Sequence, residues 1–370
     1  MHILHIASTL NIGGGESVIR DLSVNSVKRG HKVTVITFFI SANNHIVDHM
    51  RQNDVEIILI PNPSFFSFYK AIKCLANHLQ KSEYDVVHVH FRTTLWYVAL
   101  AKIRLQKRLK LIRTEHSPIV AKDKVDRIGL VLLKPFVKKM YSQYNKVICV
   151  SHHVYHSVIR YAPKMQNKCE LIYNGVDLKQ LEFENIRSSD LKNDTFTIVT
   201  VAGLCPVKRL ETCIYAVSQL KINVNWYIYG DGSSRKELSL LIKKFNLQDK
   251  VFLPGFKKNV LELIQKADLY VQPSASEGFC MALLEAMACG LPVIVSNVPS
   301  MLEVIGHAGL VFPVNEVAVL ASLINSLTQD PYLRKELAQR SLERSQLFDL
   351  ENTASHYETL YQKVNNFKIQ

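Results

Sequence analysis

Residues 268–303 read DLYVQPSASEGFCMALLEAMACGLPVIVSNVPSMLE. Polar and apolar residues alternate over 268–272, which predicts a strand, and the small polar residues of 275–278 predict a turn. Good helix formers fill 280–289, and the β-branched run 292–296 predicts a second, buried strand. The stretch is therefore a strand-helix-strand unit whose first strand ends in a loop, the place where open parallel sheets bind ligands.

Two carboxylates, Glu277 and Glu285, flank the start of this predicted helix. If the helix begins near Phe279, Glu285 lies in its second turn and Glu277 just before the first, so both would face one crevice beside the free helix amides. Those amides attract an anion, and carboxylates accept hydrogen bonds from hydroxyls. A nucleotide-sugar, with phosphates between two hydroxyl-rich groups, fits this arrangement. The alternative is that Glu277 is a solvated turn residue and Glu285 an exposed helix residue. The helix is largely apolar, however, and a carboxylate on such a helix needs a partner, which favours a binding site.

The same stretch resembles the E-x7-E signature of the retaining glycosyltransferases of family 4, also called glycosyl transferases group 1. The matching residues are Glu277, Gly278, Phe279, Glu285, Ala286, Gly290, Pro292 and Val293. The resemblance covers nearly the whole chain and implies the GT-B fold, an α/β fold in which two doubly wound, Rossmann-like parallel-sheet domains face a central cleft. It implies an acceptor-binding domain over 1–178, a donor-binding domain over 195–350, and a C-terminal helix over 351–370 that crosses back to the first domain.

Size and charge agree with a two-domain globular protein. The chain has 370 residues, enough for two domains, and seven cysteines without a C-x-x-C pair, so neither a disulfide framework nor a zinc knuckle is indicated. Residues 1–177 hold 25 Lys+Arg against 12 Asp+Glu, and residues 178–370 hold 20 against 20, so the net charge of +13 belongs to the first half. We expect the basic half to face an anionic partner.

The N-terminus enters a strand directly, and the apolar runs are broken by Gly, Pro, Asn or Ser. We therefore expect no signal peptide and no membrane-spanning helix. The expected location is the cytoplasm, with the inner face of the membrane as a further possibility.

A glycine-rich segment, 13–15, separates the predicted strand 2–7 from the predicted helix 16–29. The dinucleotide fingerprint is disfavoured, because its third glycine falls at Val18 and the next strand ends without an acidic residue. The resemblance implies that Gly14 and Gly15 approach the donor phosphates and the acceptor. A plain tight turn is the alternative.

Further strands are predicted at 32–38, 55–60, 85–90, 110–115, 146–150 and 170–173, with helices between them. His90 and His116 fall at the carboxyl ends of two of these strands. The resemblance implies that His116 contacts the donor sugar. His90 is either a site residue or a core histidine, and Glu115 is a weaker candidate that fits a structural hydrogen-bond acceptor equally well.

In the second half, the strand 196–202 is followed by Lys208 and Arg209. The family usually has an arginine and a lysine here that neutralise the donor pyrophosphate; Lys208 matches the lysine, and Gly203 occupies the arginine position. Gly230, after the strand 225–229, resembles a glycine that lies against the nucleotide. A polar linker is predicted over 178–195. The donor-binding residues implied are Gly14, Gly15, Lys208, Arg209, Gly230, Gly278, Phe279, Cys280, Met281 and Glu285.

Basic residues crowd 102–113, and the predicted helix 127–144 places lysines around an apolar stripe. This pattern suits an anionic membrane surface or a lipid-linked acceptor, although a solvated helix face explains it equally well. No nucleic-acid motif accompanies the charge, so we expect no nucleic-acid partner.

The resemblance, together with the motifs at 203–209, 230 and 268–303, implies a retaining glycosyltransferase (EC 2.4) that moves a sugar from a nucleotide-diphosphate donor to a glycan or lipid-linked acceptor, in envelope polysaccharide or glycolipid synthesis. Glu277 and His116 are the catalytic candidates: Glu277 would hold sugar hydroxyls and Glu285 the ribose. The leaving diphosphate would be stabilised by Lys208, Arg209 and the helix amides. No Asp-x-Asp occurs, so we expect no metal and no cofactor besides the donor substrate. The alternatives are an epimerase or phosphorylase of the same fold, or a non-catalytic nucleotide-sugar-binding module.

Overall fold

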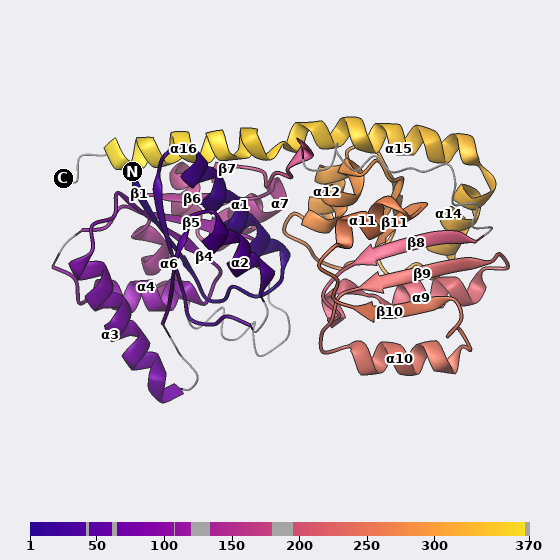
Figure 1. Cartoon of the computed structure of the whole chain (residues 1–370), viewed down its shortest axis with the longest axis horizontal. Coiled ribbons are helices and arrows are strands. Elements are labelled where there is room, and N and C mark those ends of the chain that lie inside the picture. The colour runs from indigo at the N-terminus through magenta and orange to yellow at the C-terminus, as the bar shows by residue number, and fades with distance from the viewer. Residues whose placement is uncertain (42–43, 61–64, 107, 120–133, 180–194, 367–370) are drawn as a thin grey trace. The chain divides into compact units, whose positions relative to one another are not determined.

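The computed structural model describes residues 1–41, 44–60, 65–106, 108–119, 134–179 and 195–366. The chain divides into two compact units (Figure 1). The first unit comprises residues 1–175 and 350–370, and the second comprises residues 176–349. Each unit holds one parallel sheet, so the predicted pair of α/β domains is confirmed.

The described residues of the first unit form a seven-stranded parallel sheet of order β3-β2-β1-β4-β5-β6-β7. The strands are β1 (His2–Ala7), β2 (Lys32–Thr37), β3 (Glu56–Leu59), β4 (Val86–His90), β5 (Leu111–Glu115), β6 (Lys146–Cys149) and β7 (Cys169–Leu171). Each begins and ends within two residues of the prediction, because near-continuous Val and Ile runs suit a sheet that is buried on both faces. The strand order reverses between β1 and β4, and at such a switch point the strand ends leave room for a ligand.

Helices connect these strands as the βα alternation requires. They are α1 (Gly14–Lys28), α2 (His45–Gln52), α3 (Phe65–Lys81), α4 (Thr94–Lys102), α6 (Lys134–Ser142), α7 (His152–Tyr161) and the 3-10 turn η1 (Pro163–Lys168). One expectation was wrong: Gly14 and Gly15 lie in α1 and not in the preceding loop, because the extended backbone of Gly13 ends the loop and serves as the N-cap. The predicted helix 127–144 is described only as α6, since 120–133 lie outside the described residues.

The described part of the second unit forms a six-stranded parallel sheet of order β10-β9-β8-β11-β12-β13. Its strands are β8 (Phe196–Val201), β9 (Val224–Tyr229), β10 (Val251–Gly255), β11 (Leu269–Gln272), β12 (Val293–Ser296) and β13 (Leu310–Phe312). Its helical elements are η2 (Pro206–Lys208), α9 (Glu211–Gln219), α10 (Arg235–Lys244), α11 (Val260–Gln265), α12 (Met281–Ala288), α13 (Pro299–Ile305), α14 (Val317–Gln329), α15 (Pro331–Ser345) and η3 (Gln346–Phe348). The predicted strand-helix-strand unit is therefore β11-α12-β12. Most of the predicted linker lies outside the described residues.

Trp226 of β9 is a large, fully buried side chain in the core of the second unit. Its indole N–H donates to the Thr200 hydroxyl at 3.0 Å, and that hydroxyl donates to the Val271 carbonyl at 2.7 Å. Both polar groups are thus satisfied inside the core, which avoids the cost of burying them unpaired. The three residues join the neighbouring strands β9, β8 and β11.

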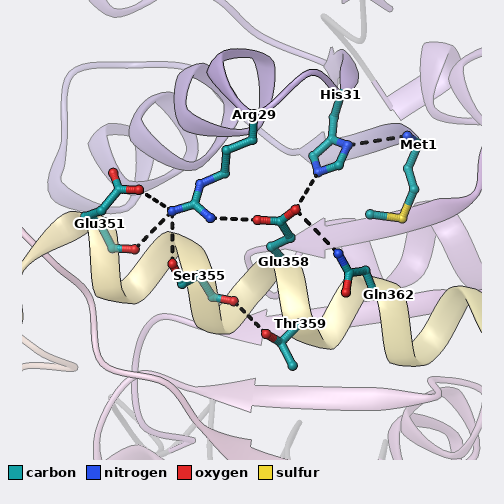
Figure 2. Close-up of polar contacts among 8 residues, drawn as sticks. All are labelled: Met1, Arg29, His31, Glu351, Ser355, Glu358, Thr359 and Gln362. Carbon is teal, nitrogen blue, oxygen red and sulfur yellow. Dashed lines mark hydrogen bonds and ion pairs between the residues drawn. The ribbon is translucent and has the colours of Figure 1, made fainter.

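The last helix, α16 (Leu350–Asn366), packs on the first unit. Its buried face includes Tyr357 and Tyr361, and its other side carries a polar cluster shown in Figure 2. Arg29, which follows α1, donates to Glu358 at 2.6 Å, to Ser355 at 3.0 Å and to Glu351. A planar guanidinium can serve several acceptors at once, so this one side chain holds two turns of α16 against α1.

We predict that Arg29→Ala loosens α16 without unfolding the chain. Because Arg29 is partly exposed, the expected loss is about 1 kcal/mol, or roughly a fivefold drop in the hydrogen-exchange protection of the α16 amides. The matched control is Arg340→Ala, which removes an exposed ion pair to Glu336 within α15 and should change protection less than about twofold. Equal effects of the two variants, or unchanged α16 protection, would contradict the assigned role of Arg29.

Candidate active site

Glu277 stands in the loop between β11 and α12, and only 9% of it is exposed. Its Oε1 atom accepts a hydrogen bond from Lys208 Nζ at 2.6 Å and another from the Ser274 hydroxyl at 2.6 Å. The Ser300 hydroxyl donates to its backbone carbonyl at 2.8 Å. Lys208 and Ser274 therefore fix the carboxylate, and Ser300 of α13 fixes the backbone of the same residue.

Lys208 ends the 3-10 turn η2, which follows β8. Burial alone would lower the pKa of Lys208, but the nearby Glu277 carboxylate outweighs it and the pKa lies above the ordinary value. The two loops are also joined through the backbone, since the Ala275 amide donates to the Val207 carbonyl at 2.8 Å. The ammonium group is thus held charged at the carboxyl ends of β8 and β11.

A line of hydrogen bonds leads from the strand β11 to Glu277. The Tyr270 hydroxyl donates to Gln272 Oε1 at 2.6 Å, and Gln272 Nε2 donates to the Ser274 hydroxyl at 2.8 Å. Ser274 then donates to Glu277. All four side chains are buried, so the line fixes the position of the carboxylate through groups that are themselves immobilised.

The helix α12 starts directly after this loop. Cys280, its N-cap, adopts a left-handed backbone with φ 62°, which is uncommon for a non-glycine residue and turns the chain sharply into the helix. Met281 and Ala282 occupy the first two helical positions, where a backbone amide has no acceptor within its own helix. The first turn thus offers donors that suit an anion.

Glu285 lies in the second turn of α12 and is half-buried. Burial raises the pKa of the Cys280 thiol, and both Glu277 and Glu285 raise it further. Both carboxylates are therefore near enough to influence the Cys280 thiol at the start of α12. Phe279 is buried and packs edge-on against Phe348 with ring centroids 5.5 Å apart, so its side chain belongs to the core.

Gly230 and Gly232 follow β9, and both have positive φ. A Cβ at Gly230 would lie 2.0 Å from the Ala202 carbonyl oxygen, and one at Gly232 would lie 2.4 Å from that of Leu204. These contacts explain both glycines by packing against the loop after β8. Arg209 is a separate case: its left-handed backbone carries a side chain that pairs with Glu211 at 3.4 Å on the surface.

In the first unit, His116 follows β5 and lies beside the start of α1. A Cβ at Gly15 would lie 2.7 Å from the Phe91 ring and 3.9 Å from Cγ of His116, so only glycine permits this close approach. Gly14 is the first residue of α1 and is exposed. Glu115 is buried and accepts hydrogen bonds from Arg113 and Tyr141. These contacts favour a structural role for Glu115 over a role in substrate binding.

Two further histidines, His5 and His88, were not among the sequence candidates. His5 Nδ1 lies 2.9 Å from His90 Nε2, and His90 Nδ1 lies 3.1 Å from His116 Nε2. His88 instead contacts the Tyr361 hydroxyl at 2.8 Å and the Thr114 hydroxyl at 2.7 Å. The only sequence signal was a histidine at the inner positions of two apolar strands, which by itself predicts a core residue.

His5, His88 and His90 bring possible metal-ligand atoms within 4.8 Å of one another. Five of their six ring nitrogens already have a hydrogen-bond partner, and only Nε2 of His5 is buried without one. A metal ion would need lone pairs that these contacts already occupy. The cluster therefore fits a hydrogen-bonded network better than a metal site.

Glu16, in the first turn of α1, was also not predicted as a site residue. Burial raises the pKa of its carboxyl group to about 7. A Cβ at Gly13 would lie 2.7 Å from its Oε2 atom, so the carboxylate folds back over the glycine-rich turn. The raised pKa of Glu16 depends on burial, which the spacing of residues in the sequence does not reveal.

Comparisons with known proteins find glycosyltransferases over most of the chain. The model "Glycosyl transferases group 1" matches residues 182–344, and "Glycosyltransferase Family 4" matches residues 12–180. The chain is 26% identical to the N-acetyl-alpha-D-glucosaminyl L-malate synthase of Bacillus anthracis over 96% of this chain and 95% of that one. It is 31% identical to the N-acetylgalactosamine-N,N'-diacetylbacillosaminyl-diphospho-undecaprenol 4-alpha-N-acetylgalactosaminyltransferase of Campylobacter jejuni over 49% and 50% of the two chains.

Solved structures show the same fold. Anabaena Alr3699/HepE in complex with UDP-glucose superposes with a TM-score of 0.82 at 21% identity, covering 98% of this chain and all of that one. Among the residues that the structure describes, no helix is both long and apolar enough to span a membrane.

We predict that Glu277→Gln destabilises the second unit by about 2 kcal/mol, because Lys208 is left largely buried without a counter-charge. The measurement is urea denaturation. Since the pKa of Lys208 is raised, the pair contributes fully at neutral pH, and the contribution is lost as the pH rises above 10.5 through that raised pKa. The difference between wild type and variant should therefore shrink in this range.

The control for this substitution is Glu211→Gln, which breaks the ion pair between Glu211 and Arg209. Both side chains of this pair are more exposed than those of Lys208 and Glu277, so the loss of stability should be less than about 0.5 kcal/mol. A Glu277→Gln variant as stable as the control would show that the ion pair does not hold these loops together.

Proposed function

The chain belongs to the family-4 glycosyltransferases and has the GT-B fold, and we propose that it transfers a sugar from a nucleotide-diphosphate donor to a glycan or lipid-linked acceptor with retention of anomeric configuration. The observation that carries the donor assignment is the charged Lys208 held by Glu277 beside the first turn of α12. This site has the donors that a diphosphate requires, and the Anabaena structure holds UDP-glucose on the same fold.

Cleavage of the sugar–phosphate bond leaves negative charge on the diphosphate. Lys208 would neutralise this charge, and the amides of Met281 and Ala282 would donate hydrogen bonds to the phosphate oxygens. Because these groups are held in place before the substrate arrives, they need not reorganise during the reaction. Glu285 is proposed to hold the ribose, as a half-buried carboxylate near the same turn.

Glu277 fits a binding role better than that of a nucleophile. Its Oε1 atom is occupied by Lys208 and Ser274, and charge-assisted hydrogen bonds of this kind reduce the reactivity of a carboxylate. Among the described residues, Oε2 has no hydrogen-bond partner, so this atom would accept a hydrogen bond from a sugar hydroxyl. In the first unit, His116 is proposed to contact a hydroxyl of the transferred sugar.

Gly203 stands where the family usually has an arginine. It is exposed, its φ is not in the left-handed region, and a Cβ would meet only the Asp231 carbonyl oxygen at 3.9 Å. The backbone therefore tolerates a side chain here. Because Gly203 supplies no cation, Lys208 is proposed to provide most of the positive charge that binds the diphosphate in this protein. A second cation at position 203 would strengthen that binding.

The acceptor side is proposed to include an anionic membrane surface. In the first unit, Arg104 lies over the exposed ring of Tyr69 at 4.7 Å, and Lys73 is near enough to lower the pKa of Tyr69 together with Arg104. The neighbouring Ile103 is 79% exposed. Basic, aromatic and aliphatic groups together suit an interface with anionic lipid, where a lipid-linked acceptor would be found.

We predict opposite effects at two positions of the donor site. Lys208→Gln should lower kcat for donor turnover about a hundredfold, because the leaving diphosphate loses its cation, while Gly203→Arg should lower the donor KM several-fold. Lys236→Gln on the exposed side of α10 is the control. Full activity of Lys208→Gln would contradict the proposed site.

We also predict that turnover persists in the presence of a chelator, because the chain has no Asp-x-Asp motif that would hold a metal ion against the diphosphate. Activity that requires added magnesium would contradict this prediction.

We predict that the chain binds vesicles with anionic lipid and that Lys73→Glu with Arg104→Glu weakens this binding at least about fivefold, at roughly 1 kcal/mol per basic residue near the surface. Flotation with and without anionic lipid measures it. The matched control is Lys243→Glu with Lys244→Glu, a double reversal on exposed lysines of α10 in the second unit. If both double variants lose binding equally, the surface around Tyr69 has no special role.

A further inference from the structure

Three histidines from neighbouring strands of the first unit form one continuous line of hydrogen bonds. His5 lies in β1, His90 ends β4 and His116 follows β5, and these three strands are adjacent in the sheet. The links are 2.9 Å from His5 Nδ1 to His90 Nε2 and 3.1 Å from His90 Nδ1 to His116 Nε2. His5 and His90 are fully buried, whereas His116 is half-buried. The line therefore runs from the core toward the carboxyl ends of the strands.

The links occupy specific nitrogens. Because Nε2 of His116 is bonded to His90, Nδ1 is the ring nitrogen that remains for a ligand; among the described residues it has no hydrogen-bond partner. At the other end, Nε2 of His5 is buried without any partner. The ring orientation of His116 is thus set by a residue that lies deeper in the sheet.

Burial lowers the pKa of His5 to about 3 and that of His116 to about 4, and it lowers the pKa of His90 well below the ordinary value. All three rings are therefore neutral at pH 7, and each carries one N–H. Two of the three N–H groups form the links, so the third sits either on Nε2 of His5 or on Nδ1 of His116. A buried N–H without an acceptor is rarer in proteins than an unpaired acceptor, which favours Nδ1 of His116.

We propose that His5 and His90 are positioning residues that hold the His116 imidazole in one orientation and one tautomer, so that Nδ1 presents an N–H donor to a substrate oxygen. The substrate part of this inference rests on the proposed function, in which His116 meets a sugar hydroxyl. The orientation and the tautomer follow from the contacts within the first unit alone. A loosely held ring would instead spend part of its time with an acceptor nitrogen, or no nitrogen, toward the sugar.

Substitutions at His90 can break the two links separately. An asparagine amide lies near the position of a histidine Nδ1, so His90→Asn can keep the bond to His116 and lose the bond to His5. A glutamine amide reaches the position of Nε2, so His90→Gln can keep the bond to His5 and lose the bond to His116. The control is His88→Gln, at a buried histidine on the same face of β4 that contacts Tyr361 and Thr114 instead of His116.

The first measurement is the ¹⁵N NMR spectrum of the histidine rings in the full-length chain at pH 7. In wild type, in His90→Asn and in His88→Gln we expect His116 as a single neutral tautomer, with the proton on Nδ1 in wild type. In His90→Gln we expect averaged signals from two tautomers. A wild-type His116 protonated at Nε2, or identical spectra for the Asn and Gln variants, would overturn the proposal, whether or not any donor is turned over.

The second measurement is turnover of a nucleotide-sugar that the wild type uses. His90→Gln should lower kcat about tenfold with the donor KM changed less than about twofold, because a misaligned donor affects the reacting sugar more than binding. His90→Asn should stay within about threefold of wild type. If kcat of the Gln variant equals that of the Asn variant while the spectra differ as expected, the ordered tautomer exists but plays no part in the reaction.

Discussion

The ion pair between Lys208 and Glu277 is the interaction on which the second unit's candidate site depends. The two residues are 69 positions apart in sequence, and their contact at 2.6 Å joins the loop after β8 to the loop after β11. Neither charge would be tolerated alone at this depth, since an unpaired buried charge costs several kcal/mol. The pair therefore fixes an ammonium group beside the first turn of α12, and our proposal of a diphosphate site rests on that placement.

The parallel sheets supply the geometry in both units. In a parallel sheet all carboxyl ends lie on one edge, so the loops after β8, β9 and β11 converge, as do the segments after β4 and β5. Hydrogen-bonded lines then brace the side chains at these edges: Tyr270 and Gln272 lead to Glu277, and His5 and His90 lead to His116. In each case the group at the edge is held by residues from the core.

Much of the fold could be predicted from the sequence. The Val-rich and Ile-rich strands came within two residues of their observed bounds, and the stretch 268–303 formed the expected strand, helix and strand. The expectation failed at Gly14 and Gly15, because the capping role of Gly13 depends on its backbone conformation and not on its identity. The last helix was predicted over 351–370, and its described part extends from Leu350 to Asn366, with Leu350 and Val364 buried near its two ends.

The candidate site was predictable only in part. Glu277, Lys208 and His116 could be named from motif positions, and their assigned roles stay predictions. The partners that hold them could not, because a contact such as His5 to His90 spans 85 positions and has no local sequence pattern. The raised pKa of Glu16 likewise depends on burial, which no local sequence pattern shows. Spacing along the chain thus locates the edge of a sheet, and tertiary contacts decide which groups are fixed there.

The central claim is that a diphosphate binds at the start of α12, and a crystal structure of the chain with bound uridine diphosphate tests it most directly. A phosphate oxygen should lie within hydrogen-bond distance of Lys208 Nζ and of the amide of Met281 or Ala282. A diphosphate bound elsewhere, with the Lys208–Glu277 pair unchanged and no phosphate near the first turn of α12, would contradict it.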